Sequence, residues 1–256
     1  MAEVFDPLGR ITPITAAFKL DLRNLVMCNL NWDDEIPVNL KEIWMSNFKT
    51  LQEIGNIRFK RAIVPADALN LTMETIDTAD ASQSIICVAI YARFNLKSGE
   101  YSCQLVLARS KLLPEDISIP RAELMAATLN ASTGFIVKRA LGHKHTKSYK
   151  VTDSQVALHW IGCTKTKLKT WVRNRVLEIN RLTRIEDWGY VNSPDMIADM
   201  GTRKGATTSD VGPDSKWING LPWMRGSVTD FPIKTAAEVV LENEVQNESK
   251  EGIHCS

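Results

Sequence analysis

The sequence lacks the patterns of a membrane-spanning, secreted or disulfide-bonded protein. No window approaches the roughly 20 apolar residues that cross a bilayer. The acidic N-terminus, Met1–Asp6, has no basic segment followed by an apolar run. The five cysteines are scattered and include no CxxC pair, which disfavours a zinc knuckle or a disulfide framework. We therefore expect no signal peptide, no membrane partner and an intracellular location, cytoplasmic or nuclear.

Several common nucleotide-binding and hydrolase signatures are also missing. The chain has no GxGxxG after a predicted strand, no Walker A motif and no GxSxG nucleophile elbow. Its 256 residues, 44% of them hydrophobic, are enough for one large domain or two small ones. This hydrophobic content excludes a collagen-like or a wholly disordered chain.

The chain carries little net charge, +1 overall, but its charges are segregated. Residues 138–184 contain 12 Lys and Arg against two acids, whereas residues 229–256 contain two Lys against six acids. The basic segment is a candidate phosphate-binding surface or the solvated face of two helices, and charge alone favours neither. The acidic end is expected to be disordered.

Hydrophobic periodicity predicts a helical N-terminal part followed by a mixed α/β part. The expected helices cover about 14–28, 38–54, 118–141, 153–161, 168–182 and 194–202. The expected strands cover about 69–79, 84–94, 104–108, 149–152 and 188–191. The pattern predicts an α/β (α+β) fold, a five-stranded mixed sheet flanked by helices with a helical N-terminal extension. The expected units are 1–66 (helical), 67–205 (α/β domain), 206–228 (Trp/Gly/Pro-rich extension) and 229–256 (acidic tail).

Four acidic residues stand at strand ends or helix starts: Asp80, Glu123, Asp153 and Asp199. Each alone has a structural explanation, such as a helix cap, a helix-dipole contact or a turn. If the first and fourth strands are parallel neighbours, however, Asp80 and Asp153 lie side by side. Converging carboxylates repel one another, and Mg²⁺ or Mn²⁺ relieves that repulsion. Two such ions about 3.5–4 Å apart support phosphodiester cleavage, so a two-metal site is expected.

Short motifs run in a fixed order along residues 4–224. The first are Val4-Phe5-Asp6-Pro7-Leu8-Gly9 and Asn31-Trp32-Asp33-Asp34-Glu35-Ile36-Pro37. The next are Asp80-Ala81-Ser82, Ala108-Arg109-Ser110-Lys111 and Ile119-Pro120-Arg121-Ala122-Glu123-Leu124. The last are Thr152-Asp153-Ser154, Asn174-Arg175-Val176, Ala198-Asp199 with Thr202-Arg203, and Trp217, Gly220 and Trp223. Together they resemble the RNase H-like region of Bel/Pao-type LTR retrotransposon polyproteins, with the piece just upstream of it.

The resemblance implies an RNase H-like fold and hydrolysis of the RNA strand of RNA–DNA hybrids during reverse transcription. It makes Asp80, Glu123, Asp153 and Asp199 the metal ligands. The partners would be a hybrid or another nucleic acid, and the reverse transcriptase of the parent polyprotein, whose palm would precede residues 1–66. Within the basic segment, the expected nucleic-acid contacts are Lys165, Lys167, Lys169, Arg173 and Arg175.

Two departures from the family pattern keep alternatives open. The usual N-P-A-D is Met196-Ile197-Ala198-Asp199 here, which makes Asp195 a reserve candidate for the fourth acid. No Y-x-D-D polymerase motif is present. The alternative is therefore a truncated or domesticated, non-enzymatic nucleic-acid-binding protein. A remote alternative is an aspartic peptidase, because Asp77-Thr78-Ala79 resembles a D-T-G/A triplet.

Overall fold

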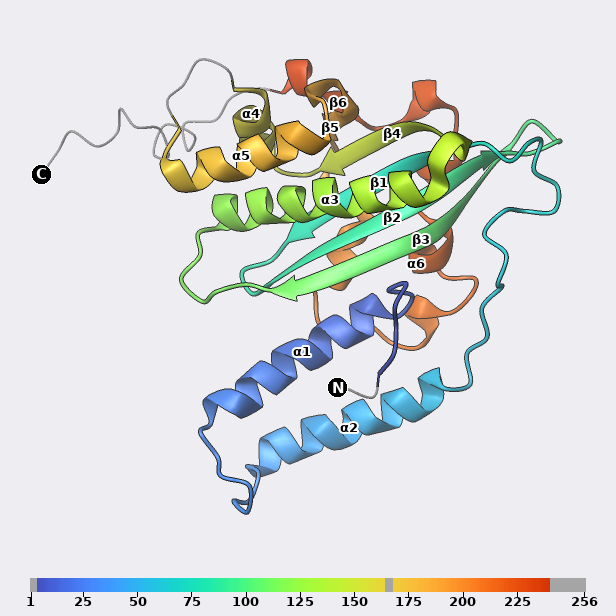
Figure 1. The fold of residues 1–256 in the computed structure, drawn as a ribbon. Helices are drawn as coiled ribbons and strands as arrows, with labels where there is room; N and C mark the ends of the chain where they lie inside the picture. The colour runs from blue at the N-terminus through green and yellow to red at the C-terminus, as the bar shows by residue number, and fades with distance from the viewer. Residues whose placement is uncertain (1–3, 164–167, 240–256) are drawn as a thin grey trace, which may run out of the picture.

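A six-stranded mixed sheet forms the centre of the computed structural model, which describes residues 4–163 and 168–239 (Figure 1). The strand order is β3-β2-β1-β4-β5-β6. The bounds are β1 Met73–Ala81, β2 Ile85–Asn95, β3 Tyr101–Leu112, β4 His145–Thr152, β5 Trp188–Tyr190 and β6 Lys234–Thr235. Strands β1, β2 and β3 are an antiparallel meander, whereas β4 runs parallel to both β1 and β5.

The helices pack on both faces of this sheet. The α-helices are α1 Thr12–Met27, α2 Val38–Ile54, α3 Ile119–Leu141, α4 Gln155–Gly162, α5 Thr170–Leu182 and α6 Lys216–Asn219. The 3₁₀ segments are η1 Gly142–Lys144, η2 Ile185–Asp187, η3 Ser193–Asp195, η4 Ile197–Gly201, η5 Ser209–Val211, η6 Pro222–Arg225, η7 Val228–Asp230 and η8 Ala236–Glu238. Figure 1 shows α3 and α5 side by side across one face, with α6 behind the sheet and α1 below β3.

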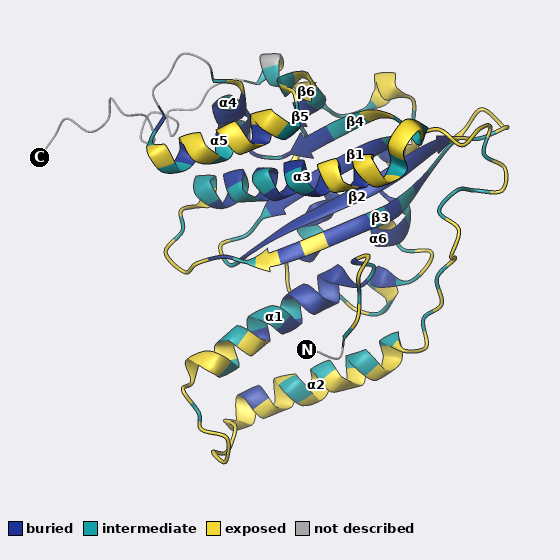
Figure 2. Ribbon diagram, in the orientation of Figure 1, coloured by how far each residue is buried: buried dark blue, intermediate teal, exposed yellow. Residues whose placement is uncertain are grey.

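Two apolar layers hold the sheet between these helices. On one face, Ala126 and Leu129 of α3 pack against Ala79 and Val88 of the sheet. On the other face, residues from α1, η4 and α6 join buried residues of β2 in one larger cluster. Strands β1 and β2 are covered on both faces and are therefore buried almost throughout (Figure 2). The mixed α/β fold expected from the sequence is confirmed.

The first turn of the N-terminal part is built into the sheet domain. The amide of Ala108 on β3 donates to the carbonyl oxygen of Leu8 at 3.0 Å, and the Trp217 indole donates to the carbonyl oxygen of Gly9 at 3.3 Å. Gly9 has φ +71° and lies directly against the backbone of Ala108, where a side chain would not fit. By contrast, α2 packs on α1 and has a single buried residue, Leu40.

Several sequence-based boundaries were wrong. The sheet has six strands rather than five, because Lys234–Thr235 pairs with β5 inside the segment expected to be disordered. Strand β1 begins at Met73, since Leu69 and Leu71 are exposed. Strand β4 begins four residues early, at His145, because backbone pairing with Met73–Thr75 extends it through polar residues. The helix expected at 194–202 is the two 3₁₀ segments η3 and η4.

The described residues include no helix both long and apolar enough to cross a membrane. The cysteines among them, Cys28, Cys87, Cys103 and Cys163, are all free thiols.

Candidate active site

The register between β1 and β4 brings two of the expected acids together. Ala79 pairs with Thr152 in the parallel ladder, so the next residues, Asp80 and Asp153, lie at the same end of neighbouring strands. Asp153 does not cap the following helix. Instead, Ser154 is the N-cap of α4, and its hydroxyl accepts a hydrogen bond from the Ala157 amide at 3.0 Å. The carboxylate of Asp153 is therefore not used in helix capping.

Asp199 comes to the same end of the sheet on η4. The two residues that follow η4 contact two of the acids: the Thr202 hydroxyl donates to Oδ2 of Asp80, and the Arg203 guanidinium lies 2.6 Å from Oδ1 of Asp199. Asp153 receives a hydrogen bond of 2.9 Å from Ser193, which begins η3. The two 3₁₀ segments and the turn after them therefore supply partners for three carboxylates.

Glu123 reaches the site from α3. It begins the second turn of that helix, not the first as the sequence suggested, because the helix starts at Ile119 and its first turn contains no acid. The Ser154 hydroxyl donates to Oε2 of Glu123. Since Ser154 follows Asp153 directly, this hydrogen bond ties the Glu123 carboxylate to the end of β4.

The electrostatics show that Asp80, Asp153 and Asp199 act on one another. Burial raises the pKa of Asp80 to about 6, with further increases from the negative charges of Asp153 and Asp199 and an opposing effect of the Thr202 hydrogen bond. Burial also raises the pKa of Asp153, and Asp199 adds to that increase while Ser193 and Arg203 oppose it. Burial is thus the main reason that the ionised form of Asp80 is disfavoured, and the two neighbouring carboxylates add to it.

The oxygen-only donor set has the chemistry of a Mg²⁺ or Mn²⁺ site. The closeness of Asp153 and Asp199, whose charges raise the pKa of Asp80, also fits a bound divalent cation. Within residues 4–163 and 168–239, however, no three Asp, Glu, His or Cys side chains are arranged to hold an ion as they stand. Each of the four acids is engaged instead by Thr202, Ser154, Ser193 or Arg203. An ion would therefore bind after side-chain rotations that exchange some of these contacts for metal–oxygen bonds.

The reserve candidate Asp195 occupies a different position. It ends η3, and its backbone carbonyl accepts a hydrogen bond of 3.2 Å from the Trp223 indole. The charge of Asp199, and not that of Asp195, contributes to the raised pKa of Asp80 and of Asp153. This arrangement favours Asp199 as the fourth acid.

The expected nucleic-acid contacts are only partly visible. Lys165 and Lys167 lie outside the described residues. Lys169 is the N-cap residue of α5, and Arg173 is exposed on that helix. The Arg175 guanidinium stacks 3.4 Å from the centroid of the Trp171 ring.

Sequence reasoning missed a second arginine at the Trp171 ring and the hydroxyl partners of the acids. Arg121, in the first turn of α3, lies over the same Trp171 ring at 5.2 Å. Thr202, Ser154 and Ser193 were missed because hydroxyl side chains carry no motif of their own. Arg121, Ser154 and Thr202 do lie within the motifs that suggested the family. Their closeness in sequence to the acids was therefore the one signal that could have identified them.

Asp77 gives the peptidase interpretation no support. Its side chain is fully buried in an ion pair with Lys150, with 2.5 Å between Oδ2 and Nζ. A peptide substrate has no access to this carboxylate.

The sheet order, the helices on its two faces and the carboxylates at the ends of β1 and β4 define an RNase H-like α/β domain. More particularly, the chain belongs to the family described as the Pao retrotransposon-like RNaseH-like domain, whose model matches residues 1–154. The match includes Asp80, Glu123 and Asp153 and ends before Asp199. No curated protein and no solved structure matches the chain.

Proposed function

We propose that this chain is a retroelement ribonuclease H that hydrolyses the RNA strand of RNA–DNA hybrids during reverse transcription. The observation that carries the proposal is the parallel β1–β4 register, which sets Asp80 beside Asp153 and leaves both carboxylates outside any helix cap. The choice of an RNA–DNA hybrid as substrate comes from the family to which the chain belongs.

The protein groups have separable roles in this reaction. Asp80, Glu123, Asp153 and Asp199 would hold two Mg²⁺ or Mn²⁺ ions. When bound, the ions would lower the pKa of the attacking water and stabilise the leaving oxygen. Thr202 and Ser154 orient Asp80 and Glu123, because each donates a hydrogen bond to an oxygen of the carboxylate. Arg203 forms an ion pair with Asp199, which would hold an ion only after giving up this partner.

The surface between α3 and α5 supports the proposed binding of nucleic acid. A groove of about 330 Å³ is lined there by Lys111, Asn174 and Arg175, among others. The exposed guanidinium of Arg173 is on the same helix, and the Trp171 ring lies against Arg175. Cations beside an aromatic ring favour a nucleic-acid backbone and its bases.

Cleavage of an end-labelled RNA–DNA hybrid tests the proposal. We expect wild-type protein to cut only the RNA strand, only with Mg²⁺ or Mn²⁺, and Asp153→Asn to lose at least about 100-fold in rate because a metal ligand is removed. The matched control is Asp195→Asn, a nearby acid outside the cluster, which should retain wild-type activity. Loss of cleavage in the control but not in Asp153→Asn would reject the assigned site.

One observation favours a second function, a non-catalytic nucleic-acid-binding protein. The acids are all engaged by protein donors, and the described residues hold no ready metal group. Equal binding of the hybrid by wild type and Asp153→Asn, with no cleavage in either metal, would establish this alternative.

A further inference from the structure

A second polar pocket lies at the other end of β4 from Asp153. It has a volume of about 530 Å³ and is enclosed by the end of α3, the start of β4 and the segment from the end of α5 to η2. Its charged and titratable lining residues are Lys138, His145, Lys147, Arg181, Arg184 and Asp187. The five lysines and arginines proposed above as nucleic-acid contacts are not among them.

The pocket gathers positive charge that the protein leaves largely unpaired. Three of the lining cations, Lys138, Arg181 and Arg184, face one acid, Asp187, whose Oδ1 lies 3.7 Å from Nη2 of the exposed Arg184. The ammonium of the fourth, Lys147, lies 4.5 Å from the centroid of the Tyr149 ring. Among the described residues, Lys138, Lys147 and Arg181 have no ion-pair partner. Like charges held together repel one another, and an anion in the pocket would relieve that repulsion.

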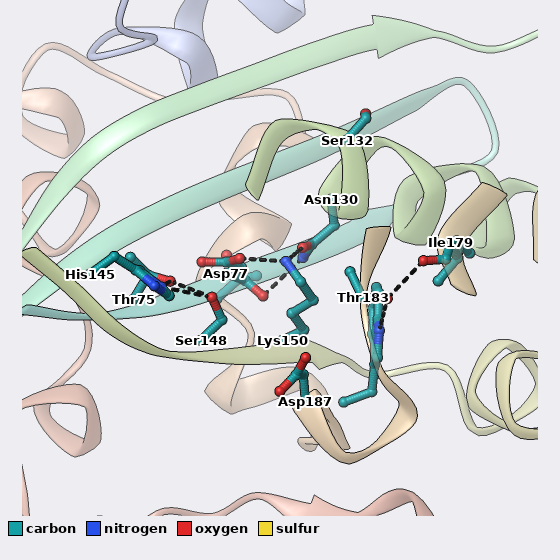
Figure 3. Close-up of polar contacts among 12 residues, drawn as sticks. Thr75, Asp77, Asn130, Ser132, His145, Ser148, Lys150, Ile179, Thr183 and Asp187 are labelled. Carbon is teal, nitrogen blue, oxygen red and sulfur yellow. Dashed lines mark hydrogen bonds and ion pairs between the residues drawn. The ribbon is translucent and has the colours of Figure 1, made fainter. Parts of the chain in front are cut away.

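The inner wall of the pocket offers neutral hydrogen-bonding groups. The Ser148 hydroxyl lies 3.0 Å from Nε2 of His145 and 3.0 Å from the hydroxyl of Thr75 (Figure 3). Burial lowers the pKa of His145, and the nearby Lys138 lowers it further, which favours the neutral imidazole. Beneath this group, the charge of Lys150 is matched by Asp77 (Figure 3). The cations without an ion-pair partner therefore lie in the pocket lining, whereas the cation beneath the pocket, Lys150, is paired.

We propose that this pocket binds a phosphate group. Guanidinium and ammonium groups arranged with hydroxyl donors suit a phosphate, which accepts several charge-assisted hydrogen bonds at once. The pocket is separate from the carboxylates, because Ser148, its last lining residue on β4, is five residues before Asp153, or about 16 Å along the strand. The phosphate belongs either to a nucleic-acid backbone or to a free phosphate or nucleotide. The inference rests on the proposed function only for the nucleic-acid backbone.

Two probes in EDTA separate these sources. The first is a fluorescein-labelled RNA–DNA hybrid of 18 base pairs, followed by anisotropy over a range of NaCl concentrations. The second is inorganic phosphate, followed through the NMR signal of His145. The test protein is Lys138→Gln/Arg181→Gln, and its matched control is Arg139→Gln, which removes an exposed charge beside Lys138 that is not part of the pocket lining.

For a backbone phosphate, the double variant should bind the hybrid about 5-fold or more weakly and lower the salt slope by about 1–2, while the control stays near wild type. For free phosphate, the His145 signal should shift saturably in wild type and control but not in the double variant. Equal behaviour of double variant and control with both probes overturns the proposal. Lys138→Arg/Arg181→Lys should restore binding, which separates loss of charge from loss of structure.

Neither probe depends on catalysis. If the hybrid is not cleaved but either probe gives the expected difference, the proposed function fails and the phosphate pocket stands. If cleavage occurs and both probes give no difference, the pocket fails and the proposed function stands.

Discussion

The Thr202 hydroxyl donates a hydrogen bond to the carboxylate of Asp80 across 122 residues of chain. It joins the turn after η4 to the end of β1, and it opposes the rise in the pKa of Asp80 caused by burial and by Asp153 and Asp199. The contact fixes the orientation of the most perturbed acid in the site. Its removal should therefore affect both stability and metal binding.

Replacing Thr202 by valine should leave one oxygen of Asp80 without its donor. Because a hydrogen bond to a charged, mostly buried group is worth roughly 1.5–3 kcal/mol, we expect a loss of that order in the free energy of unfolding at pH 7.5. The Mg²⁺ concentration for half-maximal cleavage should also rise. Urea denaturation and metal titration of activity measure the two effects. Thr202→Ser keeps the hydroxyl and should behave as wild type; equal losses in both variants would contradict the role of the hydroxyl.

The stability of the metal-free chain should fall as pH rises through 6. The pKa of Asp80 is about 6 in the folded chain, against an ordinary value of 3.8, so folding favours its protonated form. Its contribution is fully present below pH 3.8 and is lost as pH rises through about 6, by roughly 3 kcal/mol. Urea denaturation of wild type and Asp80→Asn at pH 5.0 and 7.5 in EDTA measures the part of this loss that falls in that interval, about 1.4 kcal/mol. The asparagine variant should show a smaller decrease.

A control for that pH series is Asp210→Asn. Hydrogen bonds from Thr207 lower the pKa of Asp210, so its contribution to stability has the opposite sign and is lost only as pH falls. A variant at Asp210 should therefore leave the decrease between pH 5.0 and 7.5 unchanged. The assignment to Asp80 fails if Asp80→Asn retains the full wild-type decrease.

Removing one member of the Asp77–Lys150 ion pair should be strongly destabilising. Both side chains are buried, and Lys150 also lies 3.3 Å from Oδ1 of Asn130. Lys150→Met would leave an unpaired buried charge, at a cost of about 3–5 kcal/mol. The double variant Asp77→Leu/Lys150→Met should recover much of the loss. Chemical denaturation of the two single variants and the double variant measures the coupling; additive losses would contradict it.

Alanine at Gly201 should disturb the site through packing. A Cβ at this position would collide with the Sγ of Cys87 on β2, and Gly201 stands between Asp199 and Thr202. Overpacking of this kind costs about 1–3 kcal/mol and would move η4 away from Asp80. We expect lower stability and reduced hybrid cleavage. Gly212→Ala, where the added Cβ meets only ordinary contacts, is the control in thermal denaturation and activity assays.

Local sequence was sufficient for the elements whose side chains alternate or repeat clearly. The helices around 38–54 and 118–141 and the strand around 84–94 were predicted close to their observed bounds, because their apolar residues follow a period of 3.6 or form a continuous buried run. The prediction failed where pairing or capping decides the structure. Lys234–Thr235 has no strand-like pattern, yet it pairs with β5. The polar start of β4 is a strand because Met73–Thr75 lies beside it.

The residues of the candidate site also fall into those that the sequence indicated and those that only the fold revealed. The acids Asp80, Glu123, Asp153 and Asp199 were predicted from their places at element ends and from motif order. Their partners Thr202, Ser193 and Ser154 were not, because a hydroxyl acquires its role only from what the fold places beside it. The phosphate pocket was likewise hidden, since the basic segment 138–184 does not reveal which of its cations converge.

The sequence by itself determined the class of fold and the family and predicted the four acids, because these depend on residue type and order along the chain. Only the tertiary structure decided that Ser154, and not Asp153, caps α4. It likewise decided that Thr202 donates to Asp80, and that Lys138 and Arg181 line one pocket. The physical reason is that hydrogen bonds and charge interactions act over a few ångströms in space, whatever the separation of the residues along the chain.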